Sequence, residues 1–362
     1  MGEQPGYSIE RSSDEEEDRV GDGDMCGSID LTIPVRISPT HDMEGKRNAY
    51  PLSKKIRLGL CCMDVKATSS SMKALLSRIN AYNDFEIVHF GNDVLLTRDV
   101  NEWPQCDCLI GFASGEFPLE KAIEYAKRHP DMMVLNDLPM QQTIQSRLSV
   151  YQLLEKLNVR IPPYVAVLRG ADLAEGETCD FVEETDYIVV NGVKMEKPFL
   201  EKPLCGDDHN IYLYYHSSTG GGVRRLFRKV GNQASDFLPN VSSVRRDGSY
   251  IYEKFLKCKN TQRDIKVYTI GVDYCHAESR TSPTTGEKVK RTAHGREKRF
   301  AVRLTAQEHT YAAQIVQATG QIICGIDMLR AEDGQTYVFD INGWSSVKSK
   351  SDYHQRCGRF LR

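Results

Sequence analysis

The periodicity of the apolar residues changes once along the chain, and this change restricts the possible folds more than any other feature. Through residues 56–137, stretches with the alternation of a strand are separated by stretches with the spacing of a helix. Strands that alternate with helices indicate βαβ units, so we predict a small parallel sheet within residues 51–138. The predicted strands are 56–62, 85–90, 107–113 and 132–137, and the predicted helices contain 72–79 and 119–126.

Beyond this region short strands dominate, after one further helix predicted at about 140–158. Their lengths and tight turns favour antiparallel pairing. A late helix is marked at its start by Thr305 and Glu308, which have the spacing of a capping box, and at its end by Gly320. We therefore expect an α/β part followed by an α+β part. The predicted strands are 187–190, 193–196, 210–215, 224–230, 249–255, 265–271, 274–279, 325–331 and 336–343.

The first fifty residues contain an acidic run and few large apolar side chains, with nine acidic and two basic residues in 1–24. Such a segment buries too little apolar surface to offset the conformational entropy that folding removes. We therefore predict a disordered tail and a fold that starts near Pro51. The predicted divisions are the tail 1–50, an N-terminal α/β domain 51–138, a second domain 139–350, and 351–362 as the end of that domain or the start of a linker.

Basic residues are concentrated late in the chain, although the whole chain has a formal net charge of −3. Residues 223–303 hold nineteen Lys or Arg and eight Asp or Glu, a local excess of +11. In a weakly acidic protein, such a stretch favours an anionic ligand bound at one place over a surface covered by nucleic acid. On charge alone, a solvated charged face is the alternative.

Composition also bears on the compartment. No run of about eighteen apolar residues is present, so no membrane-spanning helix is expected. The first ten residues lack the basic and then apolar order of a secretory signal. The eleven cysteines include no C-x-x-C pair, which is typical of reduced thiols in a cytosolic protein. We therefore predict a cytosolic location.

The last predicted hairpin carries a candidate metal site. Asp340 and Asn342 are two apart on one strand, so their side chains point to the same side, and Asp327 lies on the neighbouring strand. Carboxylate and amide oxygens are ligands that Mg²⁺ accepts, together with water and nucleotide phosphates. A lone D-x-N motif is also common in turns, so these residues alone leave turn chemistry as the alternative.

Two lysines and a glycine-rich segment are candidates for contact with phosphate. Lys202 ends an apolar strand, and Lys266 shares a strand face with Asp264. For both lysines the alternative is a surface side chain that packs along its stem. Three consecutive glycines at 220–222 let the backbone approach a ligand closely, although a flexible linker has the same composition. No G-K-[ST] follows them, which excludes a Walker A loop.

The strand at 249–255 has the pattern of a linker that holds adenine. Backbone groups of such linkers bind adenine between apolar walls, and Glu253 to Leu256 fit this role. Edge strands in general have a similar pattern, so the assignment stays open at this point. His209, in GDDHN, is more typical of a structural histidine than of a catalytic one.

Together these motifs resemble those of the ATP-grasp enzymes. Over about residues 55–350 they are similar, in order and spacing, to the kinase domain of the diphosphoinositol pentakisphosphate kinases. This resemblance implies an ATP-grasp fold with an N-terminal α/β (pre-ATP-grasp) domain, in which 139–350 would be the ATP-grasp kinase domain. The similar segments include FLEKPLCGDDHNIYLYY, GGGVRRLFRKVG, GSYIYEKF, DIKVYTIG, YCHAESR, CGIDMLR and FDINGWSSVK.

The resemblance implies transfer of the γ-phosphoryl group of ATP, with Mg²⁺, to a phosphate of inositol hexakisphosphate or diphosphoinositol pentakisphosphate, at the 1-position. It also implies a role for each matching residue. The implied catalytic residues are Lys266, Arg280 and His209, and the implied ATP-binding residues are Arg147, Lys202, His209, Glu253, Phe255, Leu256 and Asp264. The implied substrate contacts are Lys66, Arg228, Lys229, Lys266, Arg280, Arg299 and Lys348, and the implied metal ligands are Asp327, Asp340 and Asn342.

The sequence departs from the family pattern in two respects. The segment MDVKATSSSM holds one lysine, Lys66, where the family is usually lysine-rich, so we expect weaker capture of substrate there. The chain also ends soon after the kinase domain, whereas family members usually continue into a domain that resembles the histidine acid phosphatases. We expect either a truncated chain or a kinase-only form.

Two other functions fit the same motifs. A carboxylate–amine ligase on the ATP-grasp fold would need only a modest anion site, and the basic stretch argues against it. A non-catalytic module that binds inositol polyphosphate would not need Asp340, Asn342 and Lys202. The sequence leaves protein partners and oligomeric state open.

Overall fold

The computed structural model describes residues 54–230, 232–258, 263–285, 288–289, 291–293, 297–345, 347 and 351–362. The predicted disordered tail, 1–50, and the predicted substrate contact Lys348 lie outside these residues. None of the helices in the described part is both long and apolar enough to cross a membrane.

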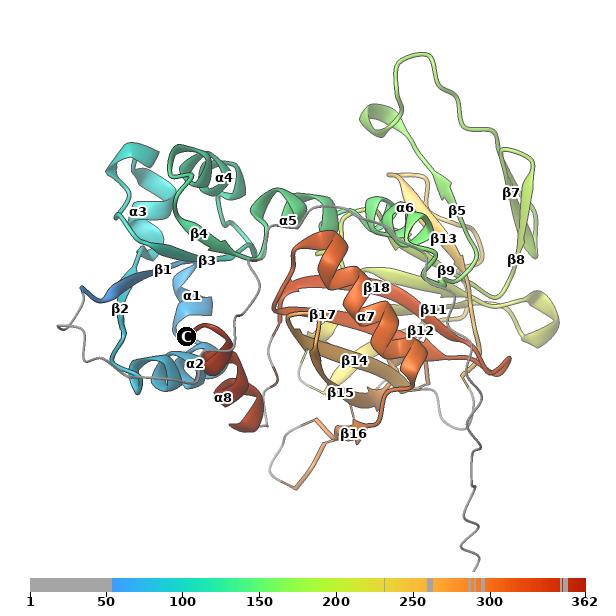
Figure 1. Cartoon of the computed structure of the whole chain (residues 1–362). Coiled ribbons are helices and arrows are strands. Elements are labelled where there is room, and N and C mark those ends of the chain that lie inside the picture. Colours follow the sequence, from blue (N-terminus) through green and yellow to red (C-terminus); the bar gives the residue numbers. More distant parts are fainter. Residues whose placement is uncertain are drawn as a thin grey trace, which may run out of the picture. The chain divides into compact units, whose positions relative to one another are not determined.

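The N-terminal part is built on a parallel sheet (Figure 1). It consists of β1 (Ile56–Cys62), α1 (Asp64–Ala67), α2 (Ser70–Asn80), β2 (Phe85–His89), α3 (Gly91–Thr97), β3 (Cys108–Phe112), α4 (Leu119–Arg128) and β4 (Met133–Leu135). The strand order is β2-β1-β3-β4, which confirms the parallel sheet predicted from the apolar pattern. Leu58 and Leu60 join an apolar cluster with α2, and Cys61 joins another with α4. Helices therefore cover both faces of this sheet.

The single helix predicted at 140–158 is wrong, because two helices occupy this segment. They are α5 (Leu138–Ile144) and α6 (Arg147–Lys156). The chain turns between them because Ser146 caps α6 by accepting a hydrogen bond from the N–H of Ser149. The N–H of Arg147 donates to the carbonyl of Leu204, so the start of α6 is fastened to a distant loop.

A six-stranded antiparallel sheet follows. The segment between its first two strands in the sequence forms a separate, small three-stranded sheet. The six-stranded sheet contains β5 (Tyr164–Val167), β9 (Phe199–Pro203), β10 (Ile211–Tyr214), β11 (Val223–Val230), β12 (Gln233–Leu238) and β13 (Tyr250–Lys254). Its strand order is β12-β11-β10-β9-β13-β5. The small sheet contains β6 (Phe181–Glu183), β7 (Tyr187–Val190) and β8 (Val193–Glu196). All pairings in both sheets are antiparallel, as predicted.

The last sheet is antiparallel and five-stranded. It contains β14 (Arg263–Ile270), β15 (Tyr274–Thr281), β16 (Phe300–Val302), β17 (Cys324–Arg330) and β18 (Thr336–Trp344), in the order β16-β15-β14-β17-β18. The helix α7 (Ala306–Thr319) begins with the predicted capping box and ends at Gly320, whose φ is 61°. Ile265 and Val267 pack with α6 and α7 on one face. Asp264 and Lys266 alternate with them and so point to the other face.

The helix α8 (Ser351–Phe360) packs against α2. Tyr353 of α8 is fully buried in the apolar cluster that also holds Leu75 of α2. Its hydroxyl donates to the carbonyls of Thr269, at 3.0 Å, and Ser345, at 3.3 Å. These contacts fasten α2 to the five-stranded sheet.

Candidate active site

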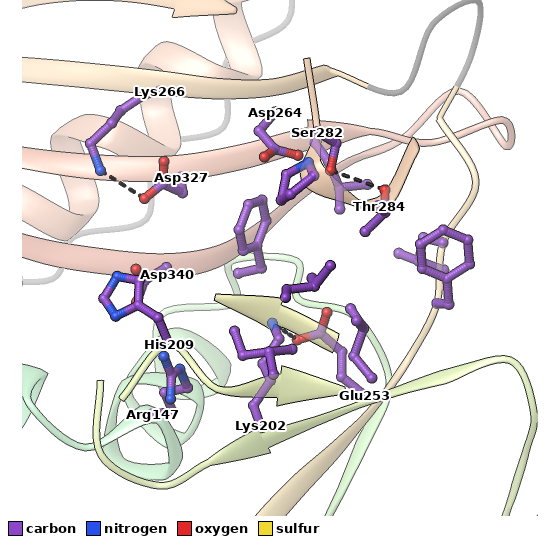
Figure 2. A pocket seen from close by; sticks show the side chains of 18 of the residues that line it. Arg147, Lys202, His209, Glu253, Asp264, Lys266, Ser282, Thr284, Asp327 and Asp340 are labelled. Carbon is purple, nitrogen blue, oxygen red and sulfur yellow. Dashed lines mark hydrogen bonds and ion pairs between the residues drawn. The ribbon is translucent and has the colours of Figure 1, made fainter. Parts of the chain in front are cut away.

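A first cavity, of about 280 Å³, lies between the six-stranded and five-stranded sheets (Figure 2). Side chains from the two sheets face each other across it, with Lys202 and Glu253 on one side and Asp264 and Asp327 on the other. Its described lining residues are Arg147, Leu200, Lys202, Gly206, His209, Ile211, Leu226, Phe227, Glu253, Phe255, Leu256, Cys258, Asp264, Lys266, Arg280, Ser282, Pro283, Thr284, Asp327, Leu329, Phe339, Asp340 and Asn342.

The three predicted metal ligands lie together on β17 and β18. Asp327 and Asp340 are paired across the two strands. The side-chain amide of Asn342 donates to Asp327, at 2.9 Å, and to Asp340, at 3.1 Å. The Oδ1 atom of Asp327 is buried and has no hydrogen-bond partner among the described residues. Such an orphaned carboxylate oxygen fits a site that receives a cation.

The pKa values of the two aspartates shift in opposite directions. Burial and the neighbouring charge of Asp327 raise the pKa of Asp340. Burial alone would raise the pKa of Asp327 as well, but Lys266 and Arg280 lower it below its usual value. Within the described residues no group of three or more His, Cys, Asp or Glu side chains is placed to hold a metal ion. A cation here would therefore depend on these two carboxylates, the amide and oxygens of a bound ligand.

Two cations stand beside this carboxylate pair. The ammonium group of Lys266 lies 2.8 Å from Asp327. The guanidinium group of Arg280 lies 3.8 Å from Asp264 and 4.0 Å from Asp327, so it is near both acids without a close hydrogen bond to either. Its Nε atom is buried and has no hydrogen-bond partner in the part of the chain that the structure describes. Arg280 is therefore placed to accept a stronger anionic partner.

A buried ion pair forms another wall of the first cavity. Lys202 on β9 and Glu253 on β13 lie 2.5 Å apart, with side-chain exposures of 7% and 3%. The hydroxyl of Tyr151 also donates to Glu253, and burial raises the pKa of this tyrosine well above its usual value. Tyr151 was not predicted from the sequence, although it lies one helical turn after Arg147 and so shares its face of α6.

Arg147 is buried and makes four hydrogen bonds to backbone carbonyls of one loop. Its guanidinium group donates to Pro203 and Cys205, both at 2.6 Å, and to Gly206 and Asp208, at 3.0 and 2.9 Å. In this structure Arg147 therefore orders the loop that precedes His209. It also lines the first cavity, so contact with a ligand in the cavity stays a prediction.

His209 lines the cavity at its exposed end, next to the strand β11. The Nε atom of Arg228 lies 3.3 Å from the Nδ1 atom of His209, and its Nη2 atom lies 3.2 Å from Asp207. Lys229 forms an ion pair with Glu297. Neither Arg228 nor Lys229 is among the lining residues of the two cavities.

A second cavity, of about 430 Å³, adjoins the first. Lys266 and Arg280 line both cavities, so the two share a wall. Lys66 and Arg299 add two further cations, and none of the described lining residues is acidic. The lining residues are Val65, Lys66, Ser69, Ser70, Ser71, Met72, Phe112, Lys266, Tyr268, Arg280, Arg299, Trp344 and Ser345.

Arg299 is held in place by three neighbours of the second cavity. It donates to the hydroxyl of Tyr268 at 2.9 Å and to Glu278 and Glu297 at 3.2 and 3.1 Å. Burial lowers the pKa of Arg299, but Tyr268 and Glu278 more than offset this effect, so its charge is retained. Tyr268 is two residues after Lys266 on β14, and both line this cavity. Trp344 is buried and also lines the cavity.

Only part of the basic stretch 223–303 converges on the cavities. Within the described residues of this stretch, the cations that line them are Lys266, Arg280 and Arg299. Others form ion pairs elsewhere, such as Arg245 with Glu201 and Arg225 with Asp236. The local charge excess therefore overstated the number of cations available to one ligand.

Solved structures with the same architecture are known. The structure is similar to that of D-cycloserine synthetase DcsG, with a TM-score of 0.52 and 14% sequence identity. The match covers 84% of this chain and 98% of the DcsG chain. The structure is also similar to that of the ATP-grasp ligase PsnB complexed with minimal precursor, Mg and ADP, with a TM-score of 0.50 and 10% sequence identity. This match covers 84% of this chain and 97% of the PsnB chain. The chain has the ATP-grasp fold. This confirms the predicted fold class.

Sequence comparisons identify closer relatives. Residues 56–146 match the diphosphoinositol pentakisphosphate kinase 2 N-terminal domain. The chain is 45% identical over 309 residues to the human inositol hexakisphosphate and diphosphoinositol-pentakisphosphate kinase 2. The aligned segment covers 85% of this chain and 24% of that protein. It is 44% identical over 320 residues to the kinase VIP1 of Arabidopsis thaliana, covering 88% of this chain and 30% of that protein. The resemblance predicted from the motifs is confirmed, and the ATP-grasp chain spans about a quarter to a third of these relatives.

Proposed function

We propose that this protein is a kinase that transfers the γ-phosphoryl group of ATP to a phosphate of inositol hexakisphosphate or diphosphoinositol pentakisphosphate. The observation that carries the proposal is the wall of Lys266 and Arg280, which is shared by a cavity with carboxylates and a cavity whose described charged lining residues are all cations. The first suits a nucleotide with its metal, and the second suits a polyanion. The names of the relatives support the same substrates.

The first cavity would hold ATP. Phe255 and Leu256, with the backbone at Glu253, would contact the adenine, as linkers with apolar walls do. Lys202, Arg147 and His209 would contact its phosphates, with Asp264 assisting in the same site. Asp327, Asp340 and Asn342 would hold Mg²⁺, which would neutralise charge on the phosphates. The fold neighbour PsnB, complexed with Mg and ADP, supports a nucleotide in this fold.

The second cavity would hold the inositol polyphosphate. Lys66, Lys266, Arg280 and Arg299 would contact its phosphates, because these four cations line the cavity and none of its described lining residues is a carboxylate. Arg228 and Lys229, on β11, are proposed as further contacts at the rim. Lys348, which lies outside the described residues, keeps its predicted role as a substrate contact.

The chemistry requires charge neutralisation more than proton transfer. A phosphate has a second pKa of about 6, so near pH 7 the attacking oxygen of the acceptor is mostly deprotonated and needs no general base. This oxygen forms a bond to the γ-phosphorus while the bond from that phosphorus to the β–γ bridging oxygen breaks, which releases ADP. Unit charges 4 Å apart repel by about 4 kcal/mol at an effective dielectric of 20. Lys266 and Arg280 stand where this repulsion would be greatest.

The test is to incubate the full chain with labelled ATP, Mg²⁺ and each inositol polyphosphate, and to identify the product. We expect a diphosphoinositol product, with the new diphosphate at the 1-position, and formation of ADP. A carboxylate–amine ligase would give no such product, and a non-catalytic module would bind inositol hexakisphosphate without consuming ATP. Either result would overturn the proposal. We also propose a cytosolic location, based on the cysteines without a paired spacing.

A further inference from the structure

A buried asparagine contributes to the contact between the N-terminal sheet and the five-stranded sheet. Asn136 follows β4, and its side-chain amide forms both of its hydrogen bonds with the backbone of Ile323, which precedes β17. The Nδ2 atom donates to the carbonyl of Ile323 at 2.8 Å, and the Oδ1 atom accepts from its N–H at 2.9 Å. Asn136 is fully buried. We call this pair of bonds the amide clasp.

Neighbouring bonds cross the same joint. The N–H of Asp137 donates to the carbonyl of Gly320 at 3.2 Å. The side-chain amide of Gln321 donates to the carbonyl of Asp137 at 2.8 Å, and Gln321 is also fully buried. These groups lie in an environment where a lost partner would leave a polar atom unsatisfied. The joint is therefore fixed in one geometry.

The backbone of Asn136 is also constrained. Its φ is 66°, in the left-handed region, which asparagine adopts more readily than most residues other than glycine. The side-chain amide of Gln141 donates to the carbonyl of Gly111 at 3.0 Å, and the Oε1 atom of Gln141 accepts from the N–H of Ala113 at 2.9 Å. Gln141 thus holds the end of β3, next to Phe112, while Asn136 holds β17.

The two cavities depend on this joint to different extents. All the described lining residues of the first cavity lie at or beyond Arg147, so none belongs to the N-terminal sheet. The second cavity has Lys66 and Phe112 on the N-terminal side and Lys266 and Trp344 on the five-stranded sheet. The spacing between its walls is therefore set by the contacts that join the two sheets.

We propose that Asn136 is a positioning residue for the acceptor: its amide clasp fixes the distance between the walls of the second cavity. This inference rests on the proposed function of that cavity. Because the first cavity does not cross the joint, loss of the clasp acts on the acceptor and spares ATP. A displacement of about 1 Å is sufficient to change a reaction rate by up to about 100-fold.

The experiment compares Asn136→Ala and Asn136→Gly with Gln142→Ala in the full chain. Gln142 is the matched control, since its amide bonds Glu120 within the N-terminal part, at 2.8 Å. We expect both Asn136 variants to raise the KM for inositol hexakisphosphate about tenfold or more, with the KM for ATP changed less than about twofold. Amide hydrogen exchange at Ile323 should accelerate in both, whereas the control should match the parent chain.

The glycine variant separates the clasp from backbone strain. Glycine suits the positive φ but lacks the amide, so normal acceptor kinetics in Asn136→Gly would overturn the proposal. Equal rises in both KM values would also overturn it, because they would indicate a general structural defect.

Two further readouts keep the test decisive. Should the Asn136 variants not fold, Gln321→Ala removes a single bond across the same joint, and an unchanged acceptor KM in that variant contradicts the proposal. Exchange at Ile323 measures the clasp without any activity, and unchanged exchange in Asn136→Ala rejects the clasp. Absence of transfer by the parent chain would instead reject the proposed function.

Discussion

The two cavities share a wall but differ in charge. The described lining residues of the first include the cations Arg147, Lys202, Lys266 and Arg280 together with the acids Glu253, Asp264, Asp327 and Asp340, whereas the second has four cations and no described acidic lining residue. A nucleotide that arrives with a divalent cation brings positive charge with it and needs carboxylates to hold that cation. An acceptor that carries only phosphates needs positive charge from the protein. The charged residues of the first cavity therefore suit a nucleotide with its metal ion, and those of the second suit a polyanion without one.

The largest effect is expected from removing a carboxylate of the first cavity. Asp340→Ala should lower kcat by at least about 10²- to 10³-fold, because it removes one of the two carboxylates that would hold the metal. Binding of inositol hexakisphosphate, measured by calorimetry, should be retained. Asp333→Ala is the control, since Asp333 is an exposed acid in the turn of the same hairpin. Unchanged turnover in Asp340→Ala would remove the metal assignment.

A substitution in the shared wall should affect the binding of both ligands, whereas a substitution in the second cavity alone should affect only the acceptor. Lys266→Ala should lower kcat and raise the KM of both ATP and acceptor, because Lys266 lines both cavities. Arg299→Ala should raise the acceptor KM alone, by about tenfold, since it removes one charged contact in the second cavity. Steady-state kinetics with each substrate varied in turn checks both. Identical patterns in the two variants would show that the cavities do not divide the ligands as proposed.

Loss of the N-terminal cation of the second cavity should have a smaller effect. Lys66→Ala should raise the acceptor KM several-fold, less than Arg299→Ala, because Lys66 is less constrained and partly exposed. Lys73→Ala is the matched control, since Lys73 lies on α2, is exposed and is not a lining residue. An acceptor KM that responds equally to both variants would exclude a specific contact at Lys66.

Ionic strength should affect ligand binding in the two cavities to different extents. Raising the ionic strength from about 0.05 to 0.3 M should increase the acceptor KM more than the ATP KM, because exposed cations are screened and the second cavity depends on cations alone. Kinetics with an inert salt at constant free Mg²⁺ measures both values. Equal responses would argue that the charge difference between the cavities does not govern binding.

The smallest effect concerns a charge that lines neither cavity. Burial alone would raise the pKa of Glu308, but Arg330, Thr305 and Thr336 lower it below its usual value of 4.5. A carboxyl with a lowered folded-state pKa stabilises the protein above its unfolded-state pKa, and this contribution is lost as the pH falls through the folded-state value. Glu308→Gln should therefore cost about 1–2 kcal/mol at pH 7 and progressively less below about pH 4.5. Thermal unfolding across pH tests this, and both KM values should stay unchanged.

Local signals in the sequence predicted much of the fold. The alternation of apolar residues located the strands of the parallel sheet, and Thr305, Glu308 and Gly320 marked both ends of α7. The split between α5 and α6 was missed because Arg147 is fastened to Leu204, far along the chain. Periodicity reports which face of an element is buried but not which distant backbone group ends it.

The candidate site was predicted less evenly. The two-residue spacing of Asp340 and Asn342 and of Asp264 and Lys266 correctly placed each pair on one strand face. The charge of 223–303 was less informative, because a window of sequence counts Arg245 but not its partner Glu201, which lies outside the window. The serines at the start of α2 and Phe112 were missed, since only the joint between the sheets brings them to the second cavity.

The wall that both cavities share would couple the binding of the two proposed ligands. Lys266 and Arg280 each carry one positive charge, and phosphates bound in the two cavities would share the attraction of these same charges. By thermodynamic reciprocity, whatever factor the nucleotide imposes on the dissociation constant of the inositol ligand, that ligand must impose on the nucleotide. For the proposed kinase, antagonism between the substrates at high concentrations of either polyanion, and its relief by the divalent ion, would then be a property of the fold and not an artefact of assay conditions.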